Sequence, residues 1–229
     1  MKQRPAQTVA SGDGPGEFAV KDCALIAIAT GLRAVTLGDL QDHLRVVAPE
    51  SLYYHVWGGL LQQRFEPREY NNDFAEWARH ALHYAPLAER LAVLDPTDYP
   101  DLEDLRREVL DRVEESLYES EDLGWMHAIR PFEFIRCQTV VFDTDRRVGH
   151  PDEMADVIPA LPPGSIFYHF IDARRREPLG VDDFRAWLRG WGPEQQALLD
   201  RLAGVDPYEG GLNELRTSLA RAFAGEEGA

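Results

Sequence analysis

The sequence predicts an α+β fold made of two similar strand-plus-helices units that share one core. The segment Ser51 to His55 recurs 114 residues later as Ser165 to His169, with aliphatic, aromatic, tyrosine and histidine residues in the same order. A cysteine recurs at the same interval, and amphipathic helical patterns follow both copies. Repeats of this length mark a duplicated structural unit. We therefore expect a tandem duplication, mostly helical, whose two lobes are related by a pseudo-twofold axis with strands near their interface.

The repeat also sets the expected domain boundaries. Residues 1–16 are rich in glycine and have no hydrophobic periodicity, which predicts a disordered arm. The expected divisions of the 229 residues are the arm over 1–16, repeat one over 17–118, a connector over 119–130, repeat two over 131–224 and a tail over 225–229.

The first element of each unit is interpreted as a strand. Residues 23–29 form a short apolar run that fits a buried helix or a buried strand equally well. The matching run in repeat two contains Thr139 to Phe142, whose β-branched and aromatic side chains favour a strand. We expect strands in both units, followed by short helices over 39–47 and 153–161, the second shortened by Pro159.

The recurring Tyr-His segments come next. Ser51 and Ser165 follow proline-rich turns and are expected to cap a helix, with a strand as the alternative. Both segments lack alternating polar residues, so most of their side chains should be buried. A buried histidine needs hydrogen-bond partners, and the neighbouring tyrosine hydroxyl could supply one.

Three helices are predicted to close each unit. Asp73 and Asp183 are expected to cap the first, with Phe and Trp one and four residues later on one face. The second should end before an Asp-Pro pair in both units. The third has the clearest apolar spacing, at Leu102, Leu105, Val109 and Val113, and again at Leu212, Leu215, Leu219 and Phe223.

Composition excludes several function classes. With 40 acidic and 24 basic residues, the net charge of −16 repels nucleic-acid phosphates and anionic membrane surfaces. The N-terminus has no apolar run typical of a signal peptide, and no segment is long enough to cross a membrane. Cys23 and Cys137 are expected to be reduced, buried thiols. These features predict a cytoplasmic protein with no nucleic-acid or membrane partner.

The Tyr54-His55 and Tyr168-His169 pairs are the leading candidate ligand-binding residues. In one interpretation the pseudo-symmetry brings the two imidazoles together, where they could hold a metal or ligand. A stable zinc site needs three or four protein ligands, however. In the other interpretation each histidine is a hydrogen-bonded core residue, which is the more common role of a buried polar group.

Other candidates have equally simple structural explanations. Asp73 with Trp77, and Asp183 with Trp187, could form a sugar-binding surface, or could be a helix cap beside a core aromatic. The run Arg174 to Arg176 could meet an anion, or could form ion pairs within an acidic protein. Catalytic motifs such as a nucleophile elbow or a His-Glu-x-x-His pair are missing from the sequence, so it assigns no catalytic residue, metal site or cofactor.

A further set of residues resembles a known family. Thr30 to Ala34, the Ser51 to His55 segment, Asn72 to Trp77 and the Leu-rich patterns after them are similar to the prokaryotic domain-of-unknown-function family 5752. The resemblance implies two divergent tandem copies and no established activity. Members of that family are found beside carbohydrate-active enzymes, which implies a small-molecule or carbohydrate-enzyme partner. The further histidines after the Tyr-His pair in this family are missing here, which argues against a metal site.

The sequence thus favours a non-catalytic ligand-binding or interaction module, associated through the resemblance with carbohydrate metabolism. An enzyme or metal-binding protein that uses the repeated Tyr-His motifs is one alternative. A structural or oligomerisation scaffold is another. A site would require the candidate side chains to converge on a cavity, whereas a scaffold would present a large exposed apolar surface. The sequence does not determine the oligomeric state.

Overall fold

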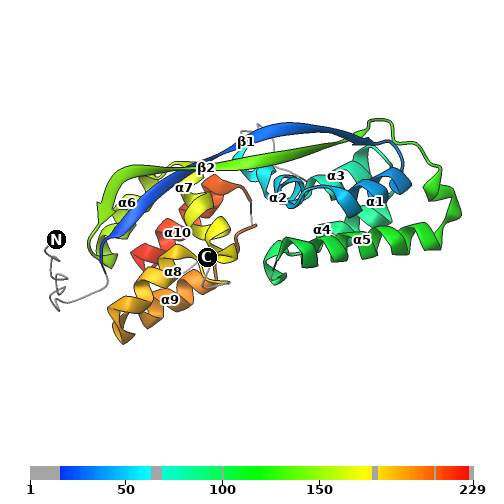
Figure 1. Cartoon of the computed structure of the whole chain (residues 1–229). Helices are drawn as coiled ribbons and strands as arrows, with labels where there is room; N and C mark the ends of the chain where they lie inside the picture. Colours follow the sequence, from blue (N-terminus) through cyan, green and yellow to red (C-terminus); the bar gives the residue numbers. More distant parts are fainter. Residues whose placement is uncertain (1–15, 63–68, 100, 177–179, 209, 227–229) are drawn as a thin grey trace, which may run out of the picture.

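A computed structural model describes residues 16–62, 69–99, 101–176, 180–208 and 210–226. Its central feature is a long antiparallel ribbon of two strands, β1 (Phe18–Ala34) and β2 (Phe132–Val148). Figure 1 shows this ribbon arching over two groups of helices, one under each end. The helices cover one side of the ribbon and leave its outer side uncovered.

The ribbon is regular in the middle and irregular at both ends. The central register runs from Lys21 opposite Asp143 to Ala29 opposite Ile135, with a register shift beyond each of these pairs. Each shift contains a residue with positive φ, Gly31 at 79° in β1 and Asp145 at 58° in β2. Glycine and aspartate are among the residues that tolerate this conformation. Because bulges bend and twist a strand, they let both ends of the ribbon curve over the helices.

A threonine supports each irregularity. The Thr30 hydroxyl donates to the Phe134 carbonyl at 2.6 Å, and the Thr144 hydroxyl donates to the Val20 carbonyl at 2.6 Å. Both carbonyls belong to the opposite strand. The side chains therefore replace main-chain ladder bonds where the register shifts.

The first helical group follows β1 in sequence. Its α-helices are α1 (Leu37–Val46), α2 (Pro49–Trp57), α3 (Asp73–His80), α4 (Ala85–Ala92) and α5 (Leu102–Glu119). Helix α1 begins with a capping box, in which the Thr36 hydroxyl accepts from the Asp39 N–H while the Asp39 carboxylate accepts from Thr36 N–H. Helix α2 begins at Pro49, whose missing N–H costs nothing at a helix start.

The second helical group follows β2. Its α-helices are α6 (Met154–Val157), α7 (Pro163–Ile166), α8 (Asp183–Leu188), α9 (Gln196–Ala203) and α10 (Leu212–Ala224). Helix α7 continues into a π-helical segment over Phe167–Ile171 and a 3₁₀ turn over Asp172–Arg175. Pro159 shortens α6, which ends two residues before it, as expected.

Each helical group is joined to the strand that belongs to the other half of the chain. Helix α2 packs against β2, while α7 and the π-helical segment pack against β1. The two thiols mark these contacts. The Cys23 thiol lies 3.4 Å from the Gly164 carbonyl oxygen, and the Cys137 thiol lies 3.6 Å from the Glu50 carbonyl oxygen. The halves are therefore interlocked through the ribbon.

The α+β, mostly helical class is confirmed, as are the strands at residues 23–29 and 139–142. The strands extend well beyond these runs, because their outer ends carry aromatic and aliphatic side chains, such as Phe18 and Phe132, that are buried against the helices. The helical interpretation of the Tyr-His segments is confirmed, and the strand alternative is wrong. The arm over 1–15 and the last three residues of the tail lie outside the described residues. Among the helices that the structure describes, none is both long and apolar enough to cross a membrane.

Four predicted helix caps are wrong. Ser51 does not cap α2, because Pro49 begins the helix earlier and the Ser51 hydroxyl instead donates to the Ile135 carbonyl at 2.7 Å. Ser165 likewise lies inside α7 rather than at its start. The caps of α3 and α8 are Asn72 and Asp182, each one residue before the predicted aspartate. The carboxylates of Asp73 and Asp183 instead lie against histidines.

Candidate functional site

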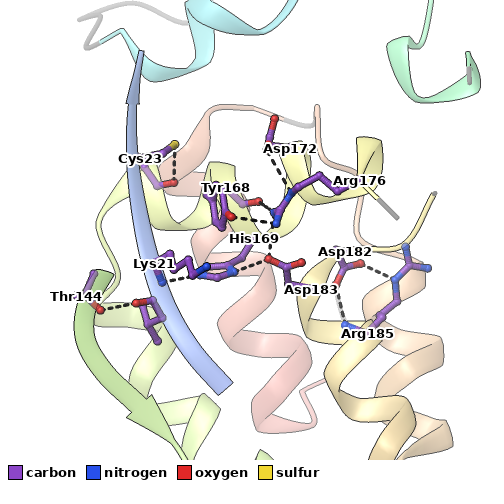
Figure 2. Close-up of polar contacts among 12 residues, drawn as sticks. Lys21, Cys23, Thr144, Tyr168, His169, Asp172, Arg176, Asp182, Asp183 and Arg185 are labelled. Carbon is purple, nitrogen blue, oxygen red and sulfur yellow. Dashed lines mark hydrogen bonds and ion pairs between the residues drawn. The ribbon is translucent and has the colours of Figure 1, made fainter. Parts of the chain in front are cut away.

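His169 lies at the centre of the best-defined polar cluster (Figure 2). Its Nδ1 is 2.7 Å from Asp183 Oδ2, and its Nε2 accepts a hydrogen bond from the main-chain N–H of Lys21 at 2.8 Å. The π-helical segment positions the ring, α8 supplies the carboxylate and β1 supplies the N–H. The imidazole is 2% exposed and packs against the ring of Phe18, with centroids 4.8 Å apart. This histidine therefore joins three elements of the fold.

His55 makes the same set of contacts in the first helical group. Its Nδ1 is 2.9 Å from Asp73 Oδ2, and its Nε2 accepts from the main-chain N–H of Ile135 at 3.0 Å. The ring of Phe132 lies 4.5 Å away, in the place that Phe18 takes beside His169. His55 thus ties α2 and α3 to β2, the strand of the other half.

These contacts fix the proton on each ring. A neutral imidazole has one N–H donor and one acceptor nitrogen. Because a main-chain N–H can only donate, Nε2 must be the acceptor and Nδ1 must carry the proton that is donated to the carboxylate. Neither nitrogen has a lone pair left for a metal ion or for proton abstraction. Ordinary histidine chemistry at either site would require one of these hydrogen bonds to break.

The two imidazoles do not converge. His169 binds the ribbon at Lys21, and His55 binds it at Ile135, which pairs with Ala29. Eight residues of regular strand separate these attachment points, which corresponds to about 27 Å at about 3.4 Å per residue. A single metal ion cannot contact both rings over that distance. Within the described residues, no group of three or more His, Cys, Asp or Glu side chains could hold a metal ion.

The tyrosines next to these histidines do not hydrogen-bond to them. The Tyr168 hydroxyl accepts from Arg176 at 3.1 Å, and the Tyr54 hydroxyl accepts from the Gln62 amide at 2.9 Å. Each tyrosine ring meets its neighbouring imidazole edge-on. The expectation that a tyrosine hydroxyl would satisfy the histidine is wrong, because Asp73 and Asp183 take that role.

The tryptophans expected beside these carboxylates contribute to the same packing. The Trp77 indole N–H donates to the Arg130 carbonyl at 2.9 Å, and the Trp187 indole N–H donates to the Gly16 carbonyl at 2.8 Å. Trp77 is 6% exposed, so little of its ring is accessible to a sugar. Each indole thus hydrogen-bonds to the segment that directly precedes a strand, β2 for Trp77 and β1 for Trp187.

The two cysteine thiols are poor nucleophiles at neutral pH. Burial raises the pKa of the Cys23 thiol to about 12 and that of the Cys137 thiol to about 11. The thiolate is the nucleophilic form of cysteine. At neutral pH both side chains remain protonated, and they act as small apolar groups between strand and helix.

The sequence profile described as "Family of unknown function (DUF5752)" matches residues 15–224. The chain belongs to this family. The match is a single one across both halves, so the expectation of two tandem copies of the family's unit remains a prediction.

The DUF5752 chain is also similar to a solved structure. A chain described as "The structure of OrfY from Thermoproteus tenax" shares 26% identity with it, at a TM-score of 0.78. The similarity covers 95% of this chain and 99% of that chain. No curated protein matches the sequence. The similarity therefore extends over the whole fold, and it assigns no activity to this chain.

The run Arg174 to Arg176 is divided between two roles in this DUF5752 protein. Arg176 forms ion pairs with Asp183 at 3.1 Å and with Asp172 at 3.4 Å, which confirms the ion-pair interpretation for this residue. Arg174 and Arg175 form no ion pair with any carboxylate of the described residues. Each guanidinium instead stacks on aromatic rings.

Sequence reasoning missed the network that joins the two helical groups. The Tyr53 hydroxyl donates to Asp172 at 2.9 Å, and Asp172 in turn pairs with Arg176. The Trp57 indole N–H donates to the Tyr208 hydroxyl at 3.2 Å. Burial and the nearby Asp172 charge raise the pKa of the Tyr53 hydroxyl, so it acts as a donor. Partners so distant in sequence give no local signal.

Proposed function

We propose that this protein is a non-catalytic ligand-binding or interaction module. In this proposal Tyr54, His55, Tyr168 and His169 organise the fold, as do the Asp-Trp pairs that follow them. The observation that carries the proposal is the full occupation of both imidazoles, each held between a carboxylate and a strand N–H. A group that must first lose a structural hydrogen bond is a poor choice for catalysis or metal binding.

We further propose that the chain is an internal duplication with a pseudo-twofold axis through the ribbon. The contacts recur at an almost constant interval. Lys21 and Ile135 are 114 positions apart and each donates to the histidine of the opposite half. Leu25 pairs with Thr139, and the two residues are also 114 positions apart, so each corresponds to the other in the duplication. The axis would therefore pass between them.

Nuclear magnetic resonance of the imidazoles tests the non-catalytic proposal. In ¹⁵N-labelled protein at pH 7.5, the His55 and His169 rings are expected to carry their proton on Nδ1. Equimolar Zn²⁺ is expected to leave these signals unchanged, while exposed histidines such as His127 provide an internal reference. A proton on Nε2, or zinc-induced shifts of the two buried rings, would favour the enzyme or metal-binding alternative.

Matched threonine variants test the duplication. Thr30→Val and Thr144→Val each remove the 2.6 Å hydrogen bond across the ribbon, together with a longer one that the hydroxyl accepts from the main-chain N–H two residues later. Each substitution is expected to cost about 1–2 kcal/mol of unfolding free energy, because a single hydrogen bond contributes about 0.5–1.5 kcal/mol. Urea unfolding should give equal costs for the two variants. A difference above about 1 kcal/mol would argue that the halves are not equivalent.

A scaffold role is the second candidate. The ribbon carries large apolar side chains that are partly open to solvent, with Ile26 50% exposed and Phe142 49% exposed. Exposed apolar surface supports a protein contact. The partner implied by the family resemblance is a carbohydrate-active enzyme, and we propose such an enzyme as the occupant of this surface. Sedimentation of the purified protein is measured between about 1 and 100 μM. A mass that rises with concentration would indicate self-association, whereas a constant monomer mass would favour a different protein as the partner.

A further inference from the structure

We propose that Arg174 and Arg175 bind a phosphate group, as inorganic phosphate or a phosphate monoester, where the two helical groups meet. The proposal rests on the ligand-binding function proposed above and identifies the ligand class. The two arginines stand at the end of the 3₁₀ turn over Asp172–Arg175, directly after the π-helical segment that carries His169. They belong to the second half of the chain but reach residues of the first.

Among the described residues, the Arg175 guanidinium contacts aromatic rings and no hydrogen-bond acceptor. Its guanidinium carbon lies 4.7 Å from the centre of the Tyr53 ring and 5.0 Å from that of Trp57, both on α2. Stacking uses the face of the guanidinium and leaves the N–H groups at its edge available. The side chain is partly exposed, so these donors can reach a ligand from solvent.

Arg174 is the more unusual of the two. Its guanidinium stacks on Phe170 at 4.4 Å, and its Nε is buried without a hydrogen-bond partner in the described structure. Burial lowers the pKa of this guanidinium, against the attraction of Asp182. Asp182 itself accepts from Arg185 at 2.5 Å and caps α8, so its oxygens are already engaged. An unpartnered buried donor is costly, and an incoming anion would remove that cost.

An aromatic pair connects the two arginines. Trp57, under Arg175, donates its indole N–H to the Tyr208 hydroxyl at 3.2 Å. The positive charge of Arg174 acts to lower the pKa of that same hydroxyl, so Arg174 lies near Tyr208 as well. Arg175 stacks on Trp57 and Arg174 lies near Tyr208, so both guanidiniums are close to one Trp-Tyr contact between the helical groups.

The corresponding positions of the first half argue for a specialised role. At the 114-residue interval, Arg174 and Arg175 correspond to Leu60 and Leu61, which pack against the core. The histidines, their aspartates, the threonines and the thiols recur in both halves. Residues that recur hold each half of the fold, whereas the arginine pair occurs once and is not needed for that purpose.

The chemistry of the pair fits a dianion. Guanidinium groups bind phosphate through paired, charge-assisted hydrogen bonds, and two of them match the charge of a phosphate monoester at neutral pH. Within the described residues the guanidiniums of Arg174 and Arg175 contact aromatic rings rather than carboxylates, so the charge of both can act on an external anion. Binding would contact both helical groups at once, through the stacked α2 aromatics and the 3₁₀ turn.

Titration with inorganic phosphate tests the proposal on the full chain. The Nε–H signals of Arg174 and Arg175 and the indole signal of Trp57 are followed by ¹H–¹⁵N spectra up to 10 mM phosphate. Sodium chloride at matched ionic strength is the control for screening. Saturable shifts of these signals are expected, and Arg174→Gln or Arg175→Gln should each weaken binding about tenfold, as expected for lost hydrogen bonds to a charged group.

Matched variants distinguish phosphate binding at Arg174 and Arg175 from a general effect of positive charge. Arg189→Gln replaces an exposed arginine elsewhere and should bind phosphate like the wild type. Arg174→Lys keeps the charge without the paired donors and should bind weakly. Shifts that do not saturate, or that persist in the Arg174→Gln/Arg175→Gln double variant, would overturn the proposal. Such a failure would leave the buried histidine signals unaffected, so it is distinguishable from failure of the proposed non-catalytic function.

Discussion

Replacing His169 with phenylalanine tests the role assigned to the buried histidines. The substitution keeps an aromatic ring beside Phe18 but removes the acceptor for the Lys21 N–H, at 2.8 Å, and the donor to Asp183, at 2.7 Å. A main-chain N–H left without a partner costs about 1–3 kcal/mol, and a hydrogen bond to a charged group contributes about 1.5–3 kcal/mol. Because Arg176 still pairs with Asp183, the lower part of these ranges applies.

The expected destabilisation is therefore about 2–4 kcal/mol. For a chain of this length, each kcal/mol shifts the melting temperature by about 2–4 °C, which predicts a drop of about 5–15 °C. Thermal and urea unfolding followed by circular dichroism measure both quantities. His169→Gln keeps an acceptor of similar reach and should recover part of the loss.

The control is His127→Phe, which changes an exposed histidine and should stay within about 0.5 kcal/mol of the wild type. Equal or higher stability of His169→Phe would refute the reasoning. That result is typical of functional residues, which are often retained at a cost to stability. It would return His169 to the list of catalytic or ligand-binding candidates.

Two further predictions concern the contacts between strand and helix. Native Cys23 and Cys137 should react with iodoacetamide at pH 8 at least about 100-fold more slowly than in urea, by mass spectrometry, because their pKa values are raised to about 12 and about 11. In the unfolded chain the pKa of these thiols returns to its ordinary value near 9. The free energy of unfolding should therefore fall as pH rises from about 9 towards 11–12, and a rise would contradict the burial argument. Gly164→Ala should cost at least about 3 kcal/mol, because its methyl group would overlap the Cys23 carbonyl oxygen, whereas Gly149→Ala should be nearly neutral in the same thermal assay.

The sequence predicted the elements better than their connections. Both central strands and the closing helices were found from apolar spacing and from comparison of the two halves. The helix caps were displaced by one residue at Asp73 and Asp183, because Asn72 and Asp182 beside them are equally good cap residues. Local sequence cannot choose between two adjacent capping side chains.

The site could be predicted only in part. The recurring histidines were recognised as buried residues that need partners, but the main-chain N–H groups that donate to them lie on strands 80 and 148 positions away. Nothing in local sequence indicates that a helix will pack against the strand of the other half. The stacking of Arg175 was equally hidden, because Trp57 is more than 100 positions earlier in the chain.

The crossed attachment of helices and strands has a consequence for synthesis on the ribosome. When the first five α-helices have emerged, β2 has not yet been made, so Phe74 and His55 have no strand to cover them. At about 5–20 residues per second, roughly 6–20 seconds pass between the appearance of β1 and that of β2. During this interval the nascent chain exposes apolar surface, and its first half can close only when the second half arrives. Neither half is therefore an autonomous folding unit, and the whole chain must fold as one.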